Sequence, residues 1–338
     1  MSDGFPAKGI SKNGLNVFGT FICGGGSTMG YKLAGFNHLG GVEIDKKVAD
    51  VYKTNHNPKH LYNEDIREFN KRTDLPKELY ELDILDGSPP CSTFSMAGAR
   101  EKGWGKEKVF REGQARQTLD DLVFVYCDTI IKLKPKTFIL ENVKGIIQGN
   151  AKLYSKQIVK KMTDAGYTVQ VFLLNAASMG VPQKRERVFF IGSKSQLRLP
   201  KLKMEFKEKP ITFAEIIDHS DKEKGLTEHQ NVIWKNRIKS DKSSGDVVMR
   251  IRGELSGFTN PIVHSNEICP TVNAQGGSFM VYDLPRHINR KEVCCVGTYP
   301  QDYTFKDLGA RYLIGMSVPP VMTAQIANQI YLQWFKKN

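Results

Sequence analysis

Residues 15–30 read Leu15-Asn16-Val17-Phe18-Gly19-Thr20-Phe21-Ile22-Cys23-Gly24-Gly25-Gly26-Ser27-Thr28-Met29-Gly30, and they combine a strand pattern with a glycine-rich turn. Its first half, Leu15–Ile22, is typical of a buried strand, and three consecutive glycines follow directly. Glycines at a strand-to-helix turn let the backbone approach a ligand closely. A tight turn without a ligand explains the glycines alone equally well. The spacing differs from GxGxxG, which counts against a dinucleotide.

Further strands and helices alternate along the chain. The β-rich runs are Leu39–Ile44, Asp83–Leu85, Thr137–Leu140, Thr168–Leu174 and Val188–Ile191. Apolar residues spaced three and four apart predict a helix over 119–133 and another around Ile158–Met162 that ends at Gly166. The alternation predicts an α/β fold with a doubly wound, mostly parallel sheet. Ligands of such sheets bind beyond the carboxyl ends of the strands.

Length and composition set limits on the class of protein. The chain has 338 residues, which suits about two domains. It contains no apolar run of about 18 residues and its N-terminus lacks the apolar region of a secretory signal, so we expect a cytoplasmic protein. Lysine and arginine outnumber aspartate and glutamate by 49 to 36, a net charge of +13. This excess is either a solubilising surface or a sign of a polyanionic partner such as nucleic acid.

The cysteines form no metal-binding or disulfide pattern. None of the six belongs to a CxxC pair or to a histidine-linked spacing; they stand at positions 23, 91, 127, 269, 294 and 295. We therefore expect no metal. Each cysteine has to be interpreted from its neighbours.

Acidic residues follow the next strands after the glycine turn. Glu43 ends the second strand, where a carboxylate can accept hydrogen bonds from the two hydroxyls of a ribose, and Asp65 follows further on. A glycine turn and two acids at strand ends predict a cofactor that contains adenosine but has no pyrophosphate.

One cysteine has a distinctive setting. The run Asp83-Ile84-Leu85-Asp86-Gly87-Ser88-Pro89-Pro90-Cys91-Ser92 leads from a strand through two prolines to Cys91. Proline restricts its own backbone and that of the preceding residue, so Cys91 follows a stiff turn. An isolated cysteine is more often a small buried hydrophobic residue. The basic, glycine-containing segment 98–116 argues against burial and is typical of a mobile lid, and a basic environment lowers a thiol pKa.

Two further motifs flank later strands. Glu141 ends the strand in Phe138-Ile139-Leu140-Glu141-Asn142-Val143, where a helix-capping role is the alternative. Arg185 and Arg187 alternate on one face at the start of the strand in 182–192, and solvated edge residues are the alternative there.

The pattern changes after residue 193. Residues 194–285 are rich in Lys, Ser, Asn and Gly, and are interpreted as a small second domain or a surface elaboration. Apolar residues at every fourth position then predict a buried helix over 321–335 that returns to the first domain.

In their order and spacing, these motifs closely resemble those of the DNA (cytosine-5) methyltransferases. The similar segments are Phe21–Gly30, Ser88–Ser92, Glu141–Val143, Gln183–Arg187, Arg290–Val293 with Gly297–Pro300, and Gly315–Pro320. The resemblance covers about residues 15–193 and 286–335. Ordered matches to several motifs rarely arise by chance.

The resemblance implies a Rossmann-like class I methyltransferase fold and two domains with different functions. Residues 1–193 plus 286–338 would form the catalytic domain, and residues 194–285 the target-recognition domain. The implied methyl donor is S-adenosylmethionine. The implied partner is double-stranded DNA, bound by a monomer, with a separate cognate restriction endonuclease where the enzyme belongs to a restriction–modification system.

The resemblance also assigns catalytic roles. Cys91 would attack carbon 6 of a flipped-out cytosine, Glu141 would contact N3 and the exocyclic amine, and Arg187 would contact O2 with Arg185 in support. The implied cofactor-binding residues are Phe21, Gly24, Gly25, Gly26, Glu43, Ile44, Asp65, Ile66, Pro89 and Ser317.

A threonine-containing segment, Cys269–Gly277, resembles the family's recognition segment. The implied DNA-binding residues are Ser92, Arg250, Arg252, Gln275 and Gly276; Arg commonly reads guanine and Gln adenine, although phosphate contacts suit the arginines equally.

The chain departs from the family pattern at three positions. Cys23 replaces the first glycine of the cofactor loop, Gly19 replaces an acid, and Met316 replaces an asparagine. Cys23 and Met316 keep open a DNA-binding homologue that does not methylate. A tRNA cytosine-5 methyltransferase also stays open, because that branch of the family shares the Pro-Cys motif. A nicotinamide-dependent dehydrogenase is favoured by the fold alone.

Overall fold

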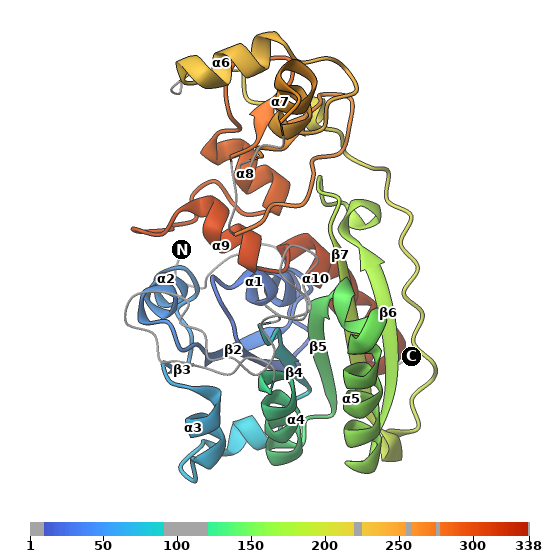
Figure 1. The fold of residues 1–338 in the computed structure, drawn as a ribbon. Coiled ribbons are helices and arrows are strands. Elements are labelled where there is room, and N and C mark those ends of the chain that lie inside the picture. Colours follow the sequence, from blue (N-terminus) through green and yellow to red (C-terminus); the bar gives the residue numbers. More distant parts are fainter. Residues whose placement is uncertain (1–9, 91–120, 220–224, 255–258, 275–277, 337–338) are drawn as a thin grey trace. The chain divides into compact units, whose positions relative to one another are not determined.

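The computed structural model describes residues 10–90, 121–219, 225–254, 259–274 and 278–336 (Figure 1). The chain divides into two compact units. The first comprises Met1–Asn175, Glu186–Glu205 and Thr323–Asn338, and the second comprises Ala176–Arg185 and Phe206–Met322. Among the described residues, no helix is long and apolar enough to cross a bilayer.

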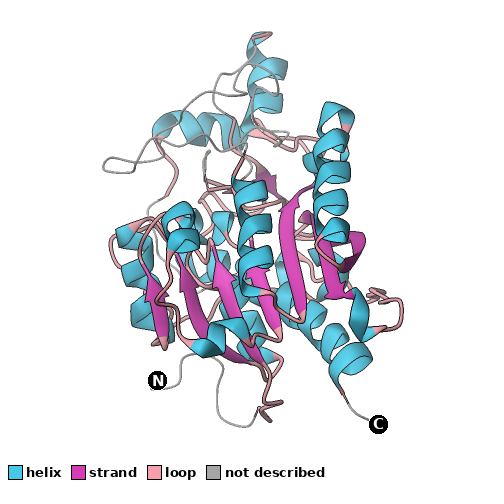
Figure 2. Cartoon of the chain, turned by 90° about the horizontal axis from the view of Figure 1, so that it is seen from below, coloured by secondary structure: helices cyan, strands magenta, loops and turns pink. Residues whose placement is uncertain are grey.

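A seven-stranded sheet in the order β3-β2-β1-β4-β5-β7-β6 forms the centre of the first unit (Figure 2). Strands β3, β2, β1, β4 and β5 are parallel, whereas β7 is antiparallel to both β5 and β6. The strands are β1 (Asn16–Thr20), β2 (Asn37–Val42), β3 (His60–Tyr62), β4 (Ile84–Gly87), β5 (Thr137–Val143), β6 (Tyr167–Asn175) and β7 (Glu186–Lys194). The predicted mostly parallel sheet is confirmed.

Helices cover both faces of this sheet (Figure 2). Adjacent residues of a strand point to opposite faces. In β4, the Asp86 side chain bonds to Tyr31 of α1 (Gly26–Leu33). The next residue, Gly87, packs against Tyr126 of α4 (Leu122–Leu133), whose ring would lie 2.4 Å from a Cβ atom on Gly87. The two helices therefore flank one strand from opposite sides, as a doubly wound fold requires.

The remaining helices of the first unit have clear end signals. Asp45 caps α2 (Lys46–His56) and Asp65 caps α3 (Ile66–Lys71) through hydrogen bonds from main-chain N–H groups. Helix α5 (Lys152–Asp164) stops just before Gly166, as predicted, where φ is 87°. The predicted C-terminal helix is α10 (Pro320–Ile330), continued by a π-helical turn, Tyr331–Phe335, and its residues from Thr323 onward belong to the first unit.

Aromatic side chains of the strands and helices pack together in the core of the first unit. Phe18 of β1 stacks on Phe69 of α3 with ring centroids 5.8 Å apart, and Phe138 of β5 meets Tyr167 of β6 edge to face at 5.3 Å. This packing fixes the strands whose ends carry the predicted site residues.

The second unit has short elements around a small core. They are α6 (Glu228–Lys235), α7 (Ser244–Arg252), β8 (Ile262–Val263), β9 (Met280–Val281), α8 (Arg290–Gly297) and α9 (Ala310–Met316). The buried cluster consists of Leu226, Ile233, Val247, Val248, Ile262 and Met280.

The compact units differ from the predicted domains at three places. Residues 176–185 belong to the second unit, where the Lys184 N–H donates a hydrogen bond to the Cys269 carbonyl oxygen at 2.8 Å. Residues 194–205 belong to the first unit, because Gln170 of β6 exchanges two hydrogen bonds with the main chain of Leu202, at 3.1 and 2.8 Å. Residues 286–322 belong to the second, where Arg286 forms a buried ion pair with Glu292 of α8 at 2.7 Å. Packing does not tell which residues read a target, so the division into 1–193 plus 286–338 and 194–285 stays a prediction.

Candidate active site

The glycine turn after β1 is tightly wound. Phe21, Cys23 and Gly25 all have left-handed backbones, with φ of 54°, 48° and 80°. A Cβ atom on Gly25 would lie 2.1 Å from Nε2 of His56, so only glycine fits there. Cys23 takes the same backbone region with a side chain, where the family pattern has glycine. Gly24, Gly25 and Gly26 are buried, and α1 begins at Gly26.

Glu43 closes this turn from the end of β2. Its Oε2 accepts a hydrogen bond from the Cys23 N–H at 3.0 Å, and its Oε1 accepts one from the Asp45 N–H at 2.9 Å. Burial raises the pKa of the Glu43 carboxyl to about 7, although these hydrogen bonds oppose the shift. The Ile44 N–H also donates to this carboxylate, which leaves one of its four lone-pair sites for a hydroxyl donor.

Neighbouring strand ends bring the other predicted cofactor residues of this unit together. Phe21 packs against buried Ile66, and Ile44 is half-buried next to Glu43 in the chain. Asp65 accepts a hydrogen bond from the Arg67 N–H at 2.8 Å, so its capping role is established. The adjacent parallel strands β3, β2 and β1 end at one edge of the sheet, which explains the grouping.

Two predicted residues have other surroundings. Pro89 is buried after β4, and its carbonyl oxygen accepts a hydrogen bond from Asn142 Nδ2 at 3.5 Å. Ser317 belongs to the second unit, where its hydroxyl donates to the Leu313 carbonyl oxygen at 2.7 Å.

Glu141 and Arg187 form an ion pair at the end of β5. Arg187 Nε lies 3.0 Å from Glu141 Oε1, and the two side chains are only 15% and 11% exposed, in the order arginine and glutamate. The antiparallel register of β5 and β7 sets Val143 opposite Arg187, which brings the arginine diagonally across from Glu141. The sequence predicted both residues, and their direct contact is a finding of the structure.

The predicted nucleophile lies outside the described residues. Cys91, Ser92 and the segment 98–116 all fall between residues 90 and 121. The strand that leads to them, β4, pairs with β5 in parallel, so the chain leaves the sheet beside the strand that carries Glu141.

Arg185 holds main chain in the second unit. Its buried guanidinium donates hydrogen bonds to the carbonyl oxygens of Val272, Gly315 and Ser317, at 3.1, 3.1 and 2.9 Å. Arg185 therefore links the Val272 segment to the end of α9.

Gln183 is a site residue that sequence reasoning did not single out, although it begins the Gln-x-Arg-x-Arg motif. Its side chain accepts a hydrogen bond from the Val272 N–H and donates one to the Val296 carbonyl oxygen, both at 3.1 Å. Thr271 donates to the Lys184 carbonyl oxygen, and the Lys184 N–H donates to the Cys269 carbonyl oxygen at 2.8 Å. The motif thus fixes the threonine-containing segment.

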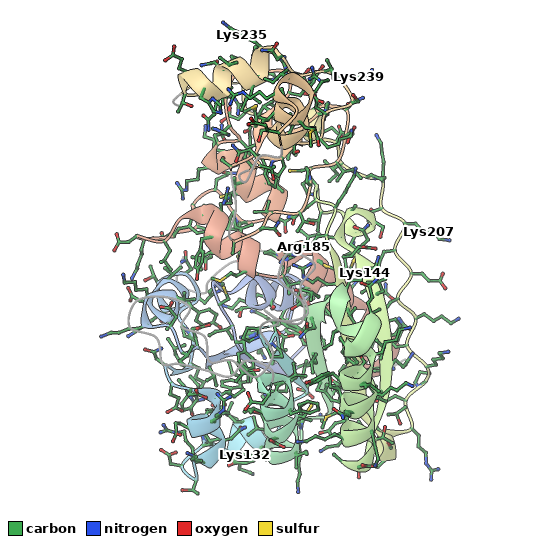
Figure 3. All side chains as sticks on the ribbon, viewed as in Figure 1. Lys132, Lys144, Arg185, Lys207, Lys235 and Lys239 are labelled. Carbon is green, nitrogen blue, oxygen red and sulfur yellow. The ribbon has the colours of Figure 1, made fainter. Side chains whose placement is uncertain are left out.

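The two predicted DNA-binding arginines have different surroundings. Arg250 donates hydrogen bonds to buried Asp241 at 2.8 Å and to the Asn236 carbonyl oxygen at 2.6 Å. Arg252, in the last turn of α7, is exposed, as are Lys235 and Lys239 (Figure 3). Gln275 and Gly276 lie outside the described residues.

The buried cysteines have raised thiol pKa values. Burial raises the pKa of the Cys127 thiol to about 12 and that of Cys294 to about 11, and it raises the pKa of Cys269 still further. These thiols stay protonated at neutral pH. Within the described ranges, no cluster of His, Cys, Asp and Glu could hold a metal ion.

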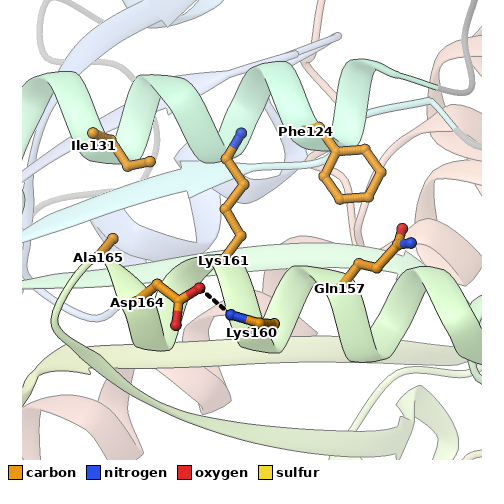
Figure 4. Close-up of a pocket in the computed structure, with 7 residues that line it drawn as sticks. All are labelled: Phe124, Ile131, Gln157, Lys160, Lys161, Asp164 and Ala165. Atoms are coloured by element: carbon orange, nitrogen blue, oxygen red, sulfur yellow. Dashed lines mark hydrogen bonds and ion pairs between the residues drawn. The ribbon is translucent and has the colours of Figure 1, made fainter.

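A groove on the first unit is separate from these residues. It lies between α4 and α5 and is lined by Phe124, Ile131, Gln157, Lys160, Lys161, Asp164 and Ala165 (Figure 4). Lys160 and Asp164 form an ion pair at 2.6 Å, and no predicted site residue lines the groove.

Known methyltransferases are similar to this chain in sequence and in structure. The Type II methyltransferase M.DdeI of Desulfomicrobium norvegicum is 26% identical over 96% of this chain and 90% of that protein. The orphan methyltransferase M.SPRI of Bacillus phage SPR is 33% identical over 54% of this chain and 37% of its own length. A solved structure described as a DNA modification methyltransferase encoded within a prophage (E. coli) superposes with a TM-score of 0.69 at 20% identity, over 95% of this chain and 100% of that one.

The chain also matches a family description over most of its length. Residues 15–332 match the model of the C-5 cytosine-specific DNA methylases, which includes the glycine turn, the Glu141–Arg187 pair and the Arg185 contacts. The dehydrogenase alternative has no support beside this match. The chain belongs to the C-5 cytosine-specific DNA methylase family and is a DNA cytosine methyltransferase.

Proposed function

We propose that this methyltransferase modifies carbon 5 of a cytosine flipped out of a specific duplex DNA sequence, through a transient bond between Cys91 and carbon 6. The observation that carries the proposal is the 3.0 Å contact between Arg187 and Glu141 beside the strand that leads to Cys91. A base in a stacked duplex cannot reach groups placed at a sheet edge, so flipping is required.

The described residues fit S-adenosylmethionine as the methyl donor. The glycine turn has no room for a Cβ on Gly25, and the half-buried Glu43 carboxylate can accept a ribose hydroxyl. Phe21, Ile44, Asp65 and Ile66 would surround the adenine, and Gly24, Gly25, Gly26, Pro89 and Ser317 would contact the remainder. When bound, this molecule supplies an electrophilic methyl group.

The side chains around the base would do the activation. Addition of the Cys91 thiolate to carbon 6 makes carbon 5 nucleophilic, which is covalent catalysis. Glu141 would hold N3 and the exocyclic amine, and Arg187 would hold O2 while it orients Glu141. Loss of the carbon-5 proton and departure of Cys91 restore the aromatic ring.

Residues 194–285 would read the target. Exposed Arg252, Lys235 and Lys239 suit phosphate contacts, and Thr271 lies in a segment fixed by Gln183 and Lys184. Ser92, Arg250, Gln275 and Gly276 complete the proposed DNA-binding set. We further propose a cytoplasmic monomer in a bacterium or phage-infected cell. Named relatives of the type II and orphan kinds leave both a paired endonuclease and solitary action open.

The test measures methyl transfer and identifies the nucleoside that receives the methyl group. The full chain is incubated with tritiated S-adenosylmethionine and either plasmid DNA or tRNA, and the product is digested to nucleosides. We expect label in 5-methyldeoxycytidine from plasmid, and a covalent adduct with DNA that contains 5-fluorocytosine. The C91S variant should lose both, whereas the matched C295S variant should keep them.

Three results would contradict the proposal. Label confined to tRNA would favour the RNA alternative. Label in N6-methyladenine would refute the assigned chemistry. DNA binding without turnover in the unmodified chain would favour a non-catalytic homologue.

A further inference from the structure

Asp86 is a buried carboxylate that faces α1 from β4. It is 7% exposed, and it accepts a hydrogen bond from the Tyr31 hydroxyl at 3.0 Å and another from the side chain of Ser27. Ser27 and Tyr31 are four residues apart, so they lie on one face of α1 on successive turns. One carboxylate therefore holds the first two turns of this helix.

Three segments of the proposed site meet at Asp86. Helix α1 begins directly after the glycine turn, and β4 continues through Ser88 toward Cys91 in the sequence. Thr20, the last residue of β1, donates a hydrogen bond to the Asp86 carbonyl oxygen at 3.3 Å. A buried carboxylate is costly unless its hydrogen bonds are kept, so these contacts resist displacement of α1.

We propose that Asp86 is a positioning residue for cofactor binding, whose carboxylate fixes α1 against β4 and so holds Gly24–Gly26 in their binding geometry. This inference rests on the proposed function, because it assumes that the glycine turn binds S-adenosylmethionine. It concerns a side chain that contacts neither cofactor nor base in that proposal.

The charge of Asp86 makes its proposed effect on cofactor binding depend on pH. Burial raises the pKa of its carboxyl to about 7, against the lowering effect of the Tyr31 and Ser27 hydrogen bonds, and the charge of Glu141 raises it further. Among the described residues, the other titratable groups that face it are Tyr31 of α1, Tyr52 of α2 and Tyr126 of α4, and burial raises the pKa of each phenol. A protonated carboxyl has one donor where the carboxylate has only acceptors, so it holds two hydroxyls less well.

The experiment measures the dissociation constant of S-adenosylhomocysteine by titration calorimetry on the full chain. At about pH 8 we expect D86N and Y31F each to weaken binding about tenfold, as loss of a hydrogen bond to a charged group predicts. The double variant should be no weaker than D86N. The matched control is Y126F, which removes an equally buried hydroxyl that donates to the Leu85 carbonyl oxygen of the same strand at 2.9 Å and should bind normally.

The pH dependence separates positioning from mere packing. The ratio of the D86N and wild-type dissociation constants should fall toward one below about pH 6, where Asp86 itself is protonated. Titration of Glu43 affects both proteins and cancels in the ratio. If D86N does not fold, Y31F and S27A carry the same measurement.

The outcomes are distinct. Folded variants that bind like the wild type, or a ratio that does not change with pH, would overturn the role of Asp86 alone. A wild-type chain that does not bind S-adenosylhomocysteine would overturn the proposed function and this inference with it.

Discussion

Arg187 Nε contacts Glu141 Oε1 at 3.0 Å, across the antiparallel pair β5 and β7. Strand β5 pairs in parallel with β4 on one edge and antiparallel with β7 on the other. The guanidinium on β7 therefore reaches the carboxylate from the neighbouring antiparallel strand. A carboxylate held this way cannot rotate freely.

We expect E141Q to lower kcat by about 100- to 1,000-fold, because a group that stabilises developing charge is lost. R187Q should lower kcat by a similar factor, and the double variant should lose less than the product of the two factors, since the residues act as a pair. Single-turnover methylation of plasmid DNA measures these rates.

The matched control for this pair lies on neighbouring positions. Lys144 and Glu186 form an ion pair at 2.9 Å, with both side chains more than a third exposed, and K144Q and E186Q should keep the wild-type rate. Equal losses in the control variants would show that any charge change near β7 lowers activity, which contradicts a specific role for Glu141 and Arg187.

Cofactor affinity should fall as the pH falls through neutrality. Burial raises the pKa of Glu43 to about 7, so below that pH the carboxylate that accepts hydroxyls becomes the minor form. Proton competition at Glu43 alone predicts about tenfold weaker binding at pH 6 than at pH 8. Calorimetric titration with S-adenosylhomocysteine measures this change. E43Q should bind weakly at pH 8 and vary less with pH; an unchanged slope would exclude Glu43 as the acceptor.

Replacement of Cys23 by glycine should stabilise the fold. Cys23 has φ of 48°, a left-handed backbone that costs a residue with a side chain about 1–2 kcal/mol of folding free energy. Glycine avoids this strain, but its greater conformational freedom in the unfolded chain offsets about 0.5–1 kcal/mol of the gain. The net gain expected for C23G is about 0.5–1 kcal/mol by denaturant unfolding. C23A keeps the strain and should gain nothing; an equal gain in both variants would point to the thiol and not to the backbone.

Much of this arrangement could be predicted from sequence because the signals are local. The glycine run after Leu15–Ile22 marks the turn between β1 and α1, and the acids after the strands mark the same edge of the sheet. Gly166 correctly predicted the end of α5. Apolar spacing found α4 and the C-terminal helix to within a turn.

Other features depend on contacts between distant residues. Strand β3 has only three residues, all half-buried, and it is defined by pairing with β2. The partners of Asp86 among the described residues, Tyr31 and Ser27, lie far from it in sequence and reach it only after α1 folds onto β4. The pairing of Arg250 with Asp241 likewise depends on how the loop before α7 closes. The spacing of apolar residues along one segment cannot predict contacts between distant segments.

The two arginines of α7 should respond differently to truncation. R252A should weaken DNA binding and reduce the slope of log Kd against log salt by about one, since an exposed arginine at a phosphate releases about one counterion. R250A should have the same effect on DNA binding and should also destabilise the chain by about 1–2 kcal/mol, because it leaves the buried Asp241 carboxylate without its cation. Fluorescence anisotropy at several salt concentrations and denaturant unfolding separate the two effects. An unchanged salt slope for R250A would show that Arg250 binds no phosphate, and would remove it from the proposed DNA-binding set.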